Sequence, residues 1–449
     1  MRHDTIAAIA SALGESAVNV IRLSGPDVFD LVNPLFKGPN LHKVVPNTIH
    51  YGFIVDGDKP IDEVLISVFH APKSFTAENT IEIHCHGGPY IANKIMSLFI
   101  AKGARQAERG EFTERAFLNG RIDLTQAESV LDMIEARSSL SLDLANKGLR
   151  GDIHRAITDL RDTLLSLIAT IEVNIDYPEY DDVEQLNASL IQPRAHTLLT
   201  TIQRILSRAE DGRIIRDGVK TAIIGRPNVG KSSLLNVLLK EDRAIVTDIH
   251  GTTRDTIEGT ANIGGLSLHL IDTAGIRESQ DIIEQIGIKR AKKVIEEAEL
   301  VLFVLNNNEP LTDDDKQLLT LTKNKKRIVI INKIDLESKI GVEFNDSVAI
   351  SALTKHGIDL LEKRIKAMFF SGEIDLDEHT YLSNTRQIGA MKQAQAALMD
   401  ALETAKTAMP IDMIAVDLKA AYDALGEIIG ETSDTALLDT LFSKFCLGK

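Results

Sequence analysis

Tryptophan is absent from the 449-residue chain, aromatic residues make up only 4% of it, and two cysteines occur, Cys85 and Cys446. Its cores must therefore rest on Leu, Ile, Val and Ala, which suits helices and parallel sheet. Two cysteines cannot form a disulfide framework, so a reducing environment is expected. No window reaches the roughly 18 apolar residues of a membrane span, and the first residues lack the pattern of a signal peptide. These absences predict a cytoplasmic protein without a membrane span.

Positive charge is also scarce, because 50 Lys and Arg residues face 65 Asp and Glu residues and leave a net charge of −15. A surface of this sign repels nucleic acid at long range. RNA binding would therefore need a local basic patch or a partner protein.

Four segments of the chain differ in their pattern of apolar and polar residues. Residues 1–119 mix strand-like runs such as VNVIRLSG and TIEIHCHGG with one helical stretch, which predicts a small α+β domain. Residues 120–217 and 373–449 are helical, whereas residues 218–372 alternate strands and helices as in a parallel α/β sheet. The economical arrangement is multidomain: one helical domain made from two segments, with the α/β domain inserted in it.

Local signals predict where several helices begin. Thr125 and Glu128 form a capping-box pattern that would open one helix through SVLDMIEARSSLSLDLANKG. Pro193 is expected in the first turn of a later helix. Apolar residues at 411, 414, 418, 421, 422, 425 and 429 predict a helical stripe that faces a core.

A phosphate-binding loop follows the strand-like run VKTAII. Gly225, four further residues and then Gly230-Lys231-Ser232 fit the P-loop pattern, and the helical run LLNVLLK comes next. The glycines allow backbone N–H groups to surround phosphates, and a helix N-terminus adds a favourable dipole. Lys231 is predicted to reach the β and γ phosphates, and Ser232 to bind Mg²⁺.

Guanine specificity is predicted from two later motifs. The run RIVIINKID ends in Asn332, Lys333 and Asp335, and the Asp335 carboxylate can accept from N1–H and the 2-amino group of guanine. Adenine offers neither donor, so the unpaired carboxylate would penalise it. The Lys333 stem can cover the base, and residues 351–353 can offer a backbone N–H to O6. This set of motifs resembles the Ras-like GTPases.

The segments between these motifs complete a GTPase pattern. In IDTAG, Asp272 is expected to hold Mg²⁺ through water and Gly275 to sense the γ-phosphate, while Thr253 in DIHGTTRD is expected to be a second Mg²⁺ ligand. Ras-type enzymes orient the attacking water with a Gln just after DTAG. Ile276 stands there and cannot do so, and no arginine finger is evident. Another group must therefore orient the attacking water and offset the negative charge of the transition state.

Longer runs resemble one family of GTPases. GRPNVGKSSLLN, TDIHGTTRD, IDTAGIRE, RGEFTERAFLNGRIDLTQAE and the terminal FCLGK are similar to the MnmE (TrmE) family of tRNA-modifying GTPases, and the likeness covers almost the whole chain. With the motifs above, it implies GTP contacts by Asn228, Val229, Gly230, Lys231, Ser232, Ser233, Thr247, Asp248, Ile249, His250, Gly251, Thr252, Thr253, Asp272, Thr273, Ala274, Gly275, Asn332, Lys333, Asp335, Ser351, Ala352 and Leu353.

The same resemblance implies a potassium mechanism. In this family K⁺ beside the phosphates supplies the charge of an arginine finger, and its ligands correspond to Asn228, Thr247, Ile249 and Thr252. The family's water-orienting glutamate corresponds to Glu284, which would otherwise be read as a solvated charge at a helix start. With Lys231 it is the expected catalytic residue.

Further expectations concern cofactors and partners. The resemblance implies an N-terminal domain that dimerises and binds a tetrahydrofolate one-carbon derivative through Arg22, Glu82, Arg121 and Lys449. It also implies a homodimer that works with the FAD-containing protein MnmG (GidA), in a heterotetramer or larger complex, on the wobble uridine of tRNA. Most of the tRNA contact is expected from that partner.

Two weaker features leave alternatives open. His84-Cys85-His86 could suggest a metal site, but strand and turn residues are favoured because no second ligand pair has metal spacing. Cys446 is either a small apolar residue or, by the resemblance, a thiol beside the folate.

A rival function is a regulatory or ribosome-assembly GTPase without modification activity. It predicts an appended RNA-binding domain such as a KH fold with a GXXG loop. The helical sequence after residue 372 has no such loop, which weighs against it. A GTPase that only dimerises is the third possibility.

Overall fold

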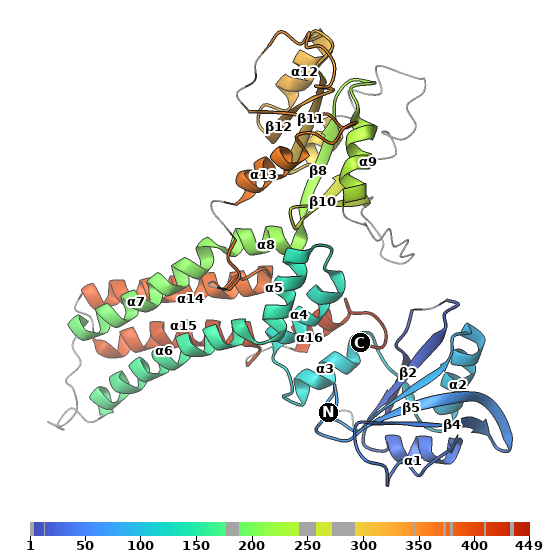
Figure 1. Cartoon of the computed structure of the whole chain (residues 1–449). Coiled ribbons are helices and arrows are strands. Elements are labelled where there is room, and N and C mark those ends of the chain that lie inside the picture. The colour runs from blue at the N-terminus through green and yellow to red at the C-terminus, as the bar shows by residue number, and fades with distance from the viewer. Residues whose placement is uncertain are drawn as a thin grey trace. The chain divides into compact units, whose positions relative to one another are not determined.

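A computed structural model gives the fold of the chain (Figure 1). It describes residues 4–12, 14–176, 188–241, 257–271, 292–342, 344, 346–370, 374–377, 380–407, 410–431 and 435–449. The chain divides into two compact units. One comprises residues 1–131 and 425–449, and the other comprises residues 132–424.

A seven-stranded sheet with the order β3-β4-β5-β6-β2-β1-β7 forms the centre of the first unit. Its neighbouring strands are antiparallel except for β1 and β7, which are parallel. The strands are β1 (Ile6–Ile9), β2 (Val18–Ser24), β3 (Phe36–Lys37), β4 (Thr48–Asp56), β5 (Lys59–Phe69), β6 (Thr80–His86) and β7 (Arg105–Gln106). The strands predicted in the runs VNVIRLSG and TIEIHCHGG are thereby confirmed as β2 and β6.

One face of this sheet carries the core of the unit. Helices α1 (Val28–Val32) and α2 (Pro89–Ala101) pack on it together with a short 3₁₀ turn, Asn33–Leu35. Strand residues alternate, so that Ile21 and Ile83 are fully buried while Arg22 and Glu82 lie on the opposite face. That second face is where polar side chains can gather.

The C-terminal segment completes this unit. Helices α3 (Glu111–Leu118) and α16 (Thr435–Phe442) pack together, and Phe442 and Phe445 are buried in a small cluster with Ala116 and Leu131. Tight packing leaves no space at Gly110, where a Cβ would lie 2.4 Å from the Phe442 carbonyl oxygen. The last residues are therefore held beside the N-terminal sheet.

The structure corrects three helix predictions. Helix α4 (Leu124–Glu135) is capped by Asp123, whose carboxylate accepts from the N–H groups of Thr125 and Gln126, so Thr125 is not the cap. The helix also ends at Glu135, and a Ser138–Ser141 capping box begins α5 (Ser139–Leu149) as a separate helix. Pro193 lies inside α7 (Ala188–Ser207), beyond the first turn.

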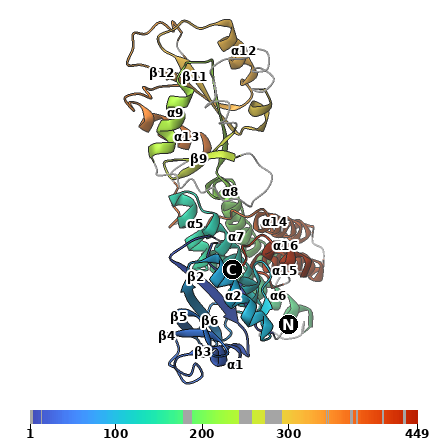
Figure 2. The same ribbon diagram turned by 90° about the vertical axis from the view of Figure 1, so that its right-hand side faces the viewer.

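Long helices from distant parts of the sequence lie side by side in the second unit. Helix α7 packs along α14 (Thr385–Lys406), and the Arg161 guanidinium of α6 lies 4.1 Å from the ring centre of Tyr422 in α15 (Figure 2). Ile414, Leu418, Ala421, Leu425 and Ile429 of the predicted stripe are buried. The remaining helices here are α6 (Asp152–Asp176), α8 (Ala209–Asp217) and α15 (Ile411–Ile429).

A six-stranded sheet with the order β13-β12-β11-β8-β10-β9 forms the rest of this unit. All neighbours are parallel except β9 and β10, which form an antiparallel hairpin around Gly264 and Gly265. Helices α9 and α13 cover one face and α12 the other. The elements are β8 (Val219–Ile224), α9 (Lys231–Glu241), β9 (Ile257–Ile263), β10 (Leu266–Ile271), β11 (Leu300–Asn306), α12 (Asp313–Leu321), β12 (Lys326–Asn332), β13 (Ser347–Ala349) and α13 (Ile358–Phe369).

Among the residues that the structure describes, none of the helices is long and apolar enough to cross a membrane.

Candidate nucleotide and N-terminal sites

The P-loop connects β8 to α9 at the carboxyl end of the parallel sheet. Gly225 has a φ of 150°, and a Cβ there would lie 2.4 Å from the Val304 carbonyl oxygen. Gly230 has a φ of 99°, and its Cβ would lie 2.1 Å from the Asn332 side-chain nitrogen. Both positions therefore need glycine, which keeps the loop backbone close to its neighbours and available to phosphate.

Lys231 is the first residue of α9 and folds back over the loop. Its ammonium group donates to the carbonyl oxygens of Gly225 and Arg226 at 2.8 and 2.6 Å. Burial lowers the pKa of Lys231 to about 8. The side chain is thus already positioned over the phosphate-binding backbone, where phosphate oxygens would stabilise its charged form.

Asn332 joins the P-loop to the segment predicted to select guanine, residues 332–335, called the guanine loop below. Its side-chain NH₂ donates to the Val229 carbonyl at 2.9 Å, and its side-chain oxygen accepts from the Ala352 N–H at 3.0 Å. Asn332 is 2% exposed, so both bonds are shielded from water. The segments 225–232, 332–335 and 351–353, predicted from separate stretches of sequence, are therefore brought together by the Asn332 side chain.

Lys333 makes a second connection to the P-loop. It has a φ of 65°, and its ammonium group donates to the Asn228 carbonyl at 2.7 Å. Asn228 itself has a φ of 62°, a conformation that asparagine tolerates better than most residues. Asp335 follows in an exposed turn, and Ser351 accepts from the Thr354 N–H at 3.2 Å. The Asp335 carboxylate is therefore accessible to a base.

Several predicted residues lie outside the described part of the chain. They are Thr247, Asp248, Ile249, His250, Gly251, Thr252, Thr253, Asp272, Thr273, Ala274, Gly275, Ile276 and Glu284. Their roles remain predictions from the sequence. Of the predicted K⁺ and Mg²⁺ ligands, Asn228 and Ser232 lie in the described P-loop.

Sequence reasoning missed an ion-pair network that holds the P-loop from the side. The Arg226 guanidinium contacts the carboxylates of Asp315 at 2.9 Å and Glu309 at 3.1 Å. Asp315 is 1% exposed and also caps α12 through Thr312. The capping pattern LTDD marks the start of α12 in the sequence, but nothing there indicates the partner, 89 residues away.

A second group of predicted residues lies on the polar face of the N-terminal sheet. Arg22 and Glu82 are direct cross-strand neighbours on β2 and β6, and their side chains form an ion pair at 2.7 Å. Arg22 also donates to the Gly448 carbonyl at 3.2 Å, and the Phe112 N–H donates to the Lys449 carbonyl at 3.2 Å. The C-terminus thus meets the Arg22–Glu82 pair.

Aromatic rings that the sequence reasoning missed complete this site. The Arg22 guanidinium lies 5.6 Å from the ring centres of both Phe75 and Phe112, and that of Arg121 lies 5.0 Å from Phe75. Burial lowers the pKa of Arg121. The structure therefore brings Arg22, Glu82, Arg121 and the C-terminus together, with two guanidinium groups, the Glu82 carboxylate and two rings on the polar face of the sheet.

In the part of the chain that the structure describes, the cysteines and histidines form no candidate metal centre. Cys85 is buried, and burial raises the pKa of its thiol to about 11. His84 contacts Ser67 at 3.1 Å and His86 contacts Asp62 at 2.7 Å, so each imidazole has its own partner. In the described ranges no three His, Cys, Asp or Glu side chains could share a metal ion. Cys446 is exposed near the C-terminus, where a thiol is accessible.

Comparison with known proteins agrees with this geometry. Two family models match: "GTP-binding protein TrmE N-terminus" over residues 5–121 and "MnmE helical domain" over residues 124–446. The tRNA modification GTPase MnmE of Geobacillus thermodenitrificans is 48% identical over 99% of both chains. The MnmE of Bacillus mycoides is 49% identical over 100% of both chains. The MnmE of Streptococcus pyogenes is 50% identical over 99% of this chain and 98% of the relative. The chain belongs to the MnmE family of tRNA modification GTPases.

Membership of the MnmE family agrees with the multidomain fold and with a GTP-hydrolysing enzyme. A solved structure of Era from Aquifex aeolicus is 33% identical over 40% of this chain and 67% of that chain, with a TM-score of 0.26. A TM-score this low carries no weight for the architecture, so the assignment rests on the full-length relatives.

Proposed function

We propose that the chain is a potassium-dependent GTPase that acts with MnmG to add a carboxymethylaminomethyl-type group to C5 of the wobble uridine in tRNA. GTP hydrolysis would drive dimerisation of its G domains in the cytoplasm. The supporting observation is the Asn332 bridge between the P-loop and the guanine loop, in a chain related over its full length to tRNA modification GTPases.

GTP is proposed to bind along the loops that Asn332 connects. Backbone N–H groups of residues 228–233 and the Lys231 ammonium group would hold the phosphates, and Asp335 would select guanine. Ser232 and Thr253 are the proposed Mg²⁺ ligands. The ion would neutralise charge on the phosphate oxygens. Residues 218–372 would form this G domain between helical segments 120–217 and 373–449.

Potassium is proposed to bind beside the phosphates through Asn228, Thr247, Ile249 and Thr252. A cation there supplies the positive charge that an arginine finger gives in other GTPases. Asn228 fits this role because it has a left-handed backbone and is exposed on the P-loop. Its backbone carbonyl already accepts from the Lys333 ammonium group, so its side-chain oxygen is the group proposed to bind K⁺. Glu284 is proposed to orient water, the task that Ile276 cannot perform.

A tetrahydrofolate derivative is proposed to bind at Arg22, Glu82, Arg121 and Lys449. The half-buried Phe75 supplies a flat surface for a ring, while the fully buried Phe112 lies behind Arg22, and two guanidinium groups supply charge for the glutamate carboxylates. The derivative would supply the one-carbon unit. Cys446 lies three residues from the C-terminus, and we propose it as a candidate for the modification chemistry.

Dimerisation is proposed to use the N-terminal domain, residues 1–119. Ile49, Tyr51 and Phe53 alternate along β4 and are 65%, 56% and 37% exposed, and Leu65 opposite Tyr51 is 46% exposed. Such an apolar strip on one sheet is typical of a surface that a partner covers. A second copy of the chain is the proposed occupant, and MnmG would join the dimer.

Potassium dependence can be tested by measuring GTP hydrolysis in KCl and in NaCl at equal ionic strength. The expected result is a rate at least tenfold higher in K⁺, because a Na⁺ ion fits a K⁺-sized oxygen site poorly. Replacing Asn228 by Ala should remove most of that difference. Equal rates of the unchanged protein in the two salts would refute the potassium mechanism.

Base recognition can be tested with Asp335→Asn. An amide at this position donates where the carboxylate accepted, so the preference should move from GTP towards xanthosine triphosphate by about two orders of magnitude. Glu337→Gln, an exposed acid two residues further on, is the matched control. Unchanged GTP affinity in Asp335→Asn would show that another residue reads the base.

A further inference from the structure

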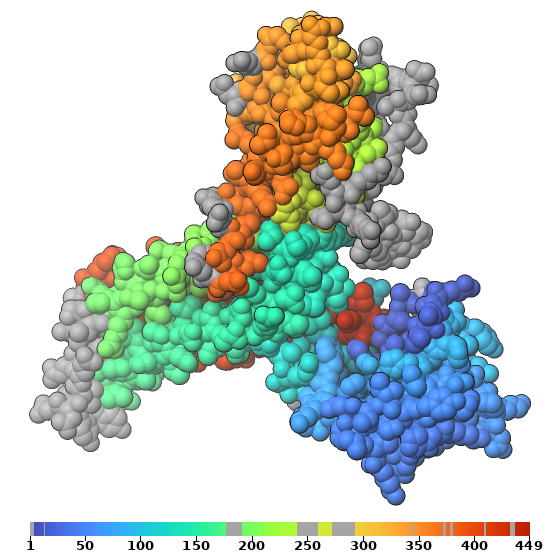
Figure 3. Space-filling model, in the orientation of Figure 1, coloured from blue at the N-terminus to red at the C-terminus, as the bar shows by residue number. Residues whose placement is uncertain are grey.

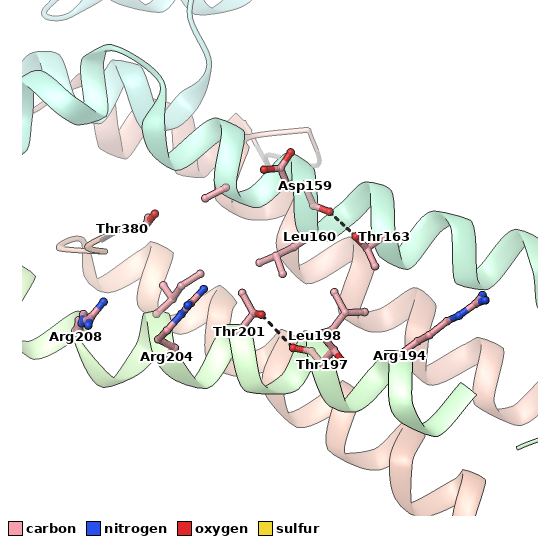
Figure 4. Close-up of a pocket in the computed structure, with 12 residues that line it drawn as sticks. Asp159, Leu160, Thr163, Arg194, Thr197, Leu198, Thr201, Arg204, Arg208 and Thr380 are labelled. Carbon is pink, nitrogen blue, oxygen red and sulfur yellow. Dashed lines mark hydrogen bonds between the residues drawn. The ribbon is translucent and has the colours of Figure 1, made fainter. Parts of the chain in front are cut away.

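A groove of about 490 Å³ runs between α6 and α7 in the helical part of the second unit. Figure 4 shows Arg194 and Arg204 on α7 and Arg208 just beyond its end, opposite Asp159 on α6. These are the charged residues of the lining, so three positive charges face one negative charge. This excess is notable in a chain whose net charge is −15.

Arg194 and Arg204 lie on α7, and Arg208 directly follows its last residue, Ser207, as the N-cap residue of α8. Positions 194, 204 and 208 are separated by 10 and 4 residues, which a helical rise of 1.5 Å converts to about 15 and 6 Å along the axis. Arg194 and Arg204 are exposed and Arg208 is half-buried. Neither Arg204 nor Arg208 forms an ion pair within the described residues. The three positions therefore span about 20 Å along the groove, and Figure 3 shows the surfaces of α6 and α7 side by side.

The rest of the lining indicates which part of a ligand would bind. Leu160, Leu198 and Ile205 are buried and form the floor. The hydroxyls of Thr163 and Thr201 already donate to carbonyls of their own helices at 2.9 and 3.1 Å. Guanidinium groups are thus the main polar donors, and none of the described lining residues is aromatic, so none could stack against a base. This composition suits phosphate groups and offers no means of reading sequence.

We propose that the α6–α7 groove binds the phosphate backbone of the tRNA on which the chain acts, with Arg194, Arg204 and Arg208 as the phosphate contacts. The proposal rests on the proposed function in tRNA modification. It answers the difficulty that the net charge of −15 raises, because the groove supplies the local basic patch that RNA binding requires. An acidic segment of a partner protein is the competing occupant. The span of the arginines favours RNA, because a nucleic-acid strand presents phosphates at regular short intervals.

The test measures binding of a fluorescent tRNA transcript with an unmodified wobble uridine to the full chain over a range of salt concentrations. Arg204→Glu/Arg208→Glu should weaken binding about tenfold or more, and the slope of log K against log salt should fall in magnitude by about 1.4 to 1.8 for two lost phosphate contacts. Arg204→Lys/Arg208→Lys should keep most of the affinity, because charge is retained.

The control is Lys392→Glu/Lys419→Glu. These exposed lysines of α14 and α15 lie outside the groove lining, and their reversal changes the net charge equally. Control binding should stay within about twofold of the unchanged protein. GTP hydrolysis should be the same in all variants, which shows that the G domain is intact.

The outcomes separate the groove from the proposed function. If the unchanged protein supports wobble modification but the Arg204/Arg208 reversal binds tRNA as the control does, the groove proposal alone is wrong. If that reversal instead loses association with MnmG, the groove binds a protein. If the unchanged protein neither binds tRNA nor supports modification, with or without MnmG, both proposals fail.

Discussion

The nucleotide loops lie at the carboxyl ends of a parallel sheet, whereas the Arg22–Glu82 site lies on the open face of an antiparallel sheet. In the parallel sheet, β8 and β12 flank β11 and end at the same edge, so the short contiguous motifs that follow them meet in one place. At the second site, the contacting groups come from positions as far apart as Arg22 and the backbone carbonyl of Gly448. A parallel sheet gathers loops, while an antiparallel face gathers single residues.

The two sites also differ in what positions the ligand groups. Around the P-loop the main contacts are backbone groups held by Asn332, Lys231 and Lys333. On the N-terminal sheet they are side chains, with Arg22 tied to Glu82 and flanked by two rings. Substitutions should therefore affect one ligand and leave the other unchanged.

The largest expected effect is that of Asn332→Ala on GTP affinity. The change leaves the Val229 carbonyl and the Ala352 N–H without their buried partner, at about 1–3 kcal/mol for each group. A loss of about 100-fold or more is expected in titrations with a fluorescent guanine nucleotide. Asn306→Ala, a buried asparagine at the end of β11 that bonds to Glu309 instead, should cost far less. Equal losses in both variants would mean that the bridge has no special role.

Arg22→Ala is the counterpart on the N-terminal sheet. It removes the guanidinium group between Phe75, Phe112 and Glu82, so tetrahydrofolate affinity should fall by about tenfold or more, as for loss of one partner of a charged pair. Calorimetric titration measures this affinity, and GTP affinity should not change. Lys94→Ala, an exposed residue of α2, is the control. The distinction between the sites breaks down if Arg22→Ala weakens GTP binding as strongly as folate binding.

Proton uptake on GTP binding is the next expected effect. Because the pKa of Lys231 is lowered to about 8, most of its amines are neutral at pH 8.5, and phosphate oxygens would restore the proton. Up to about three quarters of a proton should be taken up at pH 8.5 and almost none at pH 6.5. Calorimetry in buffers of different ionisation enthalpy gives this number. Uptake that does not increase with pH would contradict the assignment.

The lowered pKa of Lys231 also sets a sign for stability. Between pH 8 and its ordinary value of 10.5 the unfolded chain binds more protons at this residue than the folded chain does. The Lys231 contribution to the free energy of unfolding therefore rises with pH across this window. Comparison with Lys231→Met by chemical denaturation isolates it, since the variant lacks the titrating group.

Arg226→Gln should give the smallest effect. Arg226 holds the side of the P-loop through Asp315 and Glu309, but it is partly exposed and makes no bond that a phosphate must replace. A loss of about 1 kcal/mol, or about fivefold in GTP affinity, is expected. The control is Lys316→Gln, which breaks an exposed ion pair with Asp313 on α12, the helix that carries Asp315. A loss as large as that of Asn332→Ala would show that the ion pairs, and not the amide bridge, hold the loop.

The features that could be predicted from the sequence lie mainly in the contiguous nucleotide motifs, and those that could not lie mainly in the N-terminal site. Contiguous motifs such as residues 225–232 and 332–335 could be placed because a strand before and a helix after gave them context. The rings of Phe75 and Phe112 could not, since their role depends on long-range packing. Local rules also failed where two signals competed. Asp123 and Gln126 form the cap of α4, although Thr125 and Glu128 have the same spacing.

The central claim is that this GTPase is required for modification of the wobble uridine, and mass spectrometry of tRNA from a deletion strain tests it most directly. The strain should accumulate unmodified wobble uridine, and the unchanged gene should restore the modified form. Complementation with Asn332→Ala should fail and that with Arg22→Ala should be incomplete, because these variants weaken the proposed nucleotide site and the proposed folate site, respectively. Normal wobble uridine in the deletion strain, or full restoration by Asn332→Ala, would contradict the account.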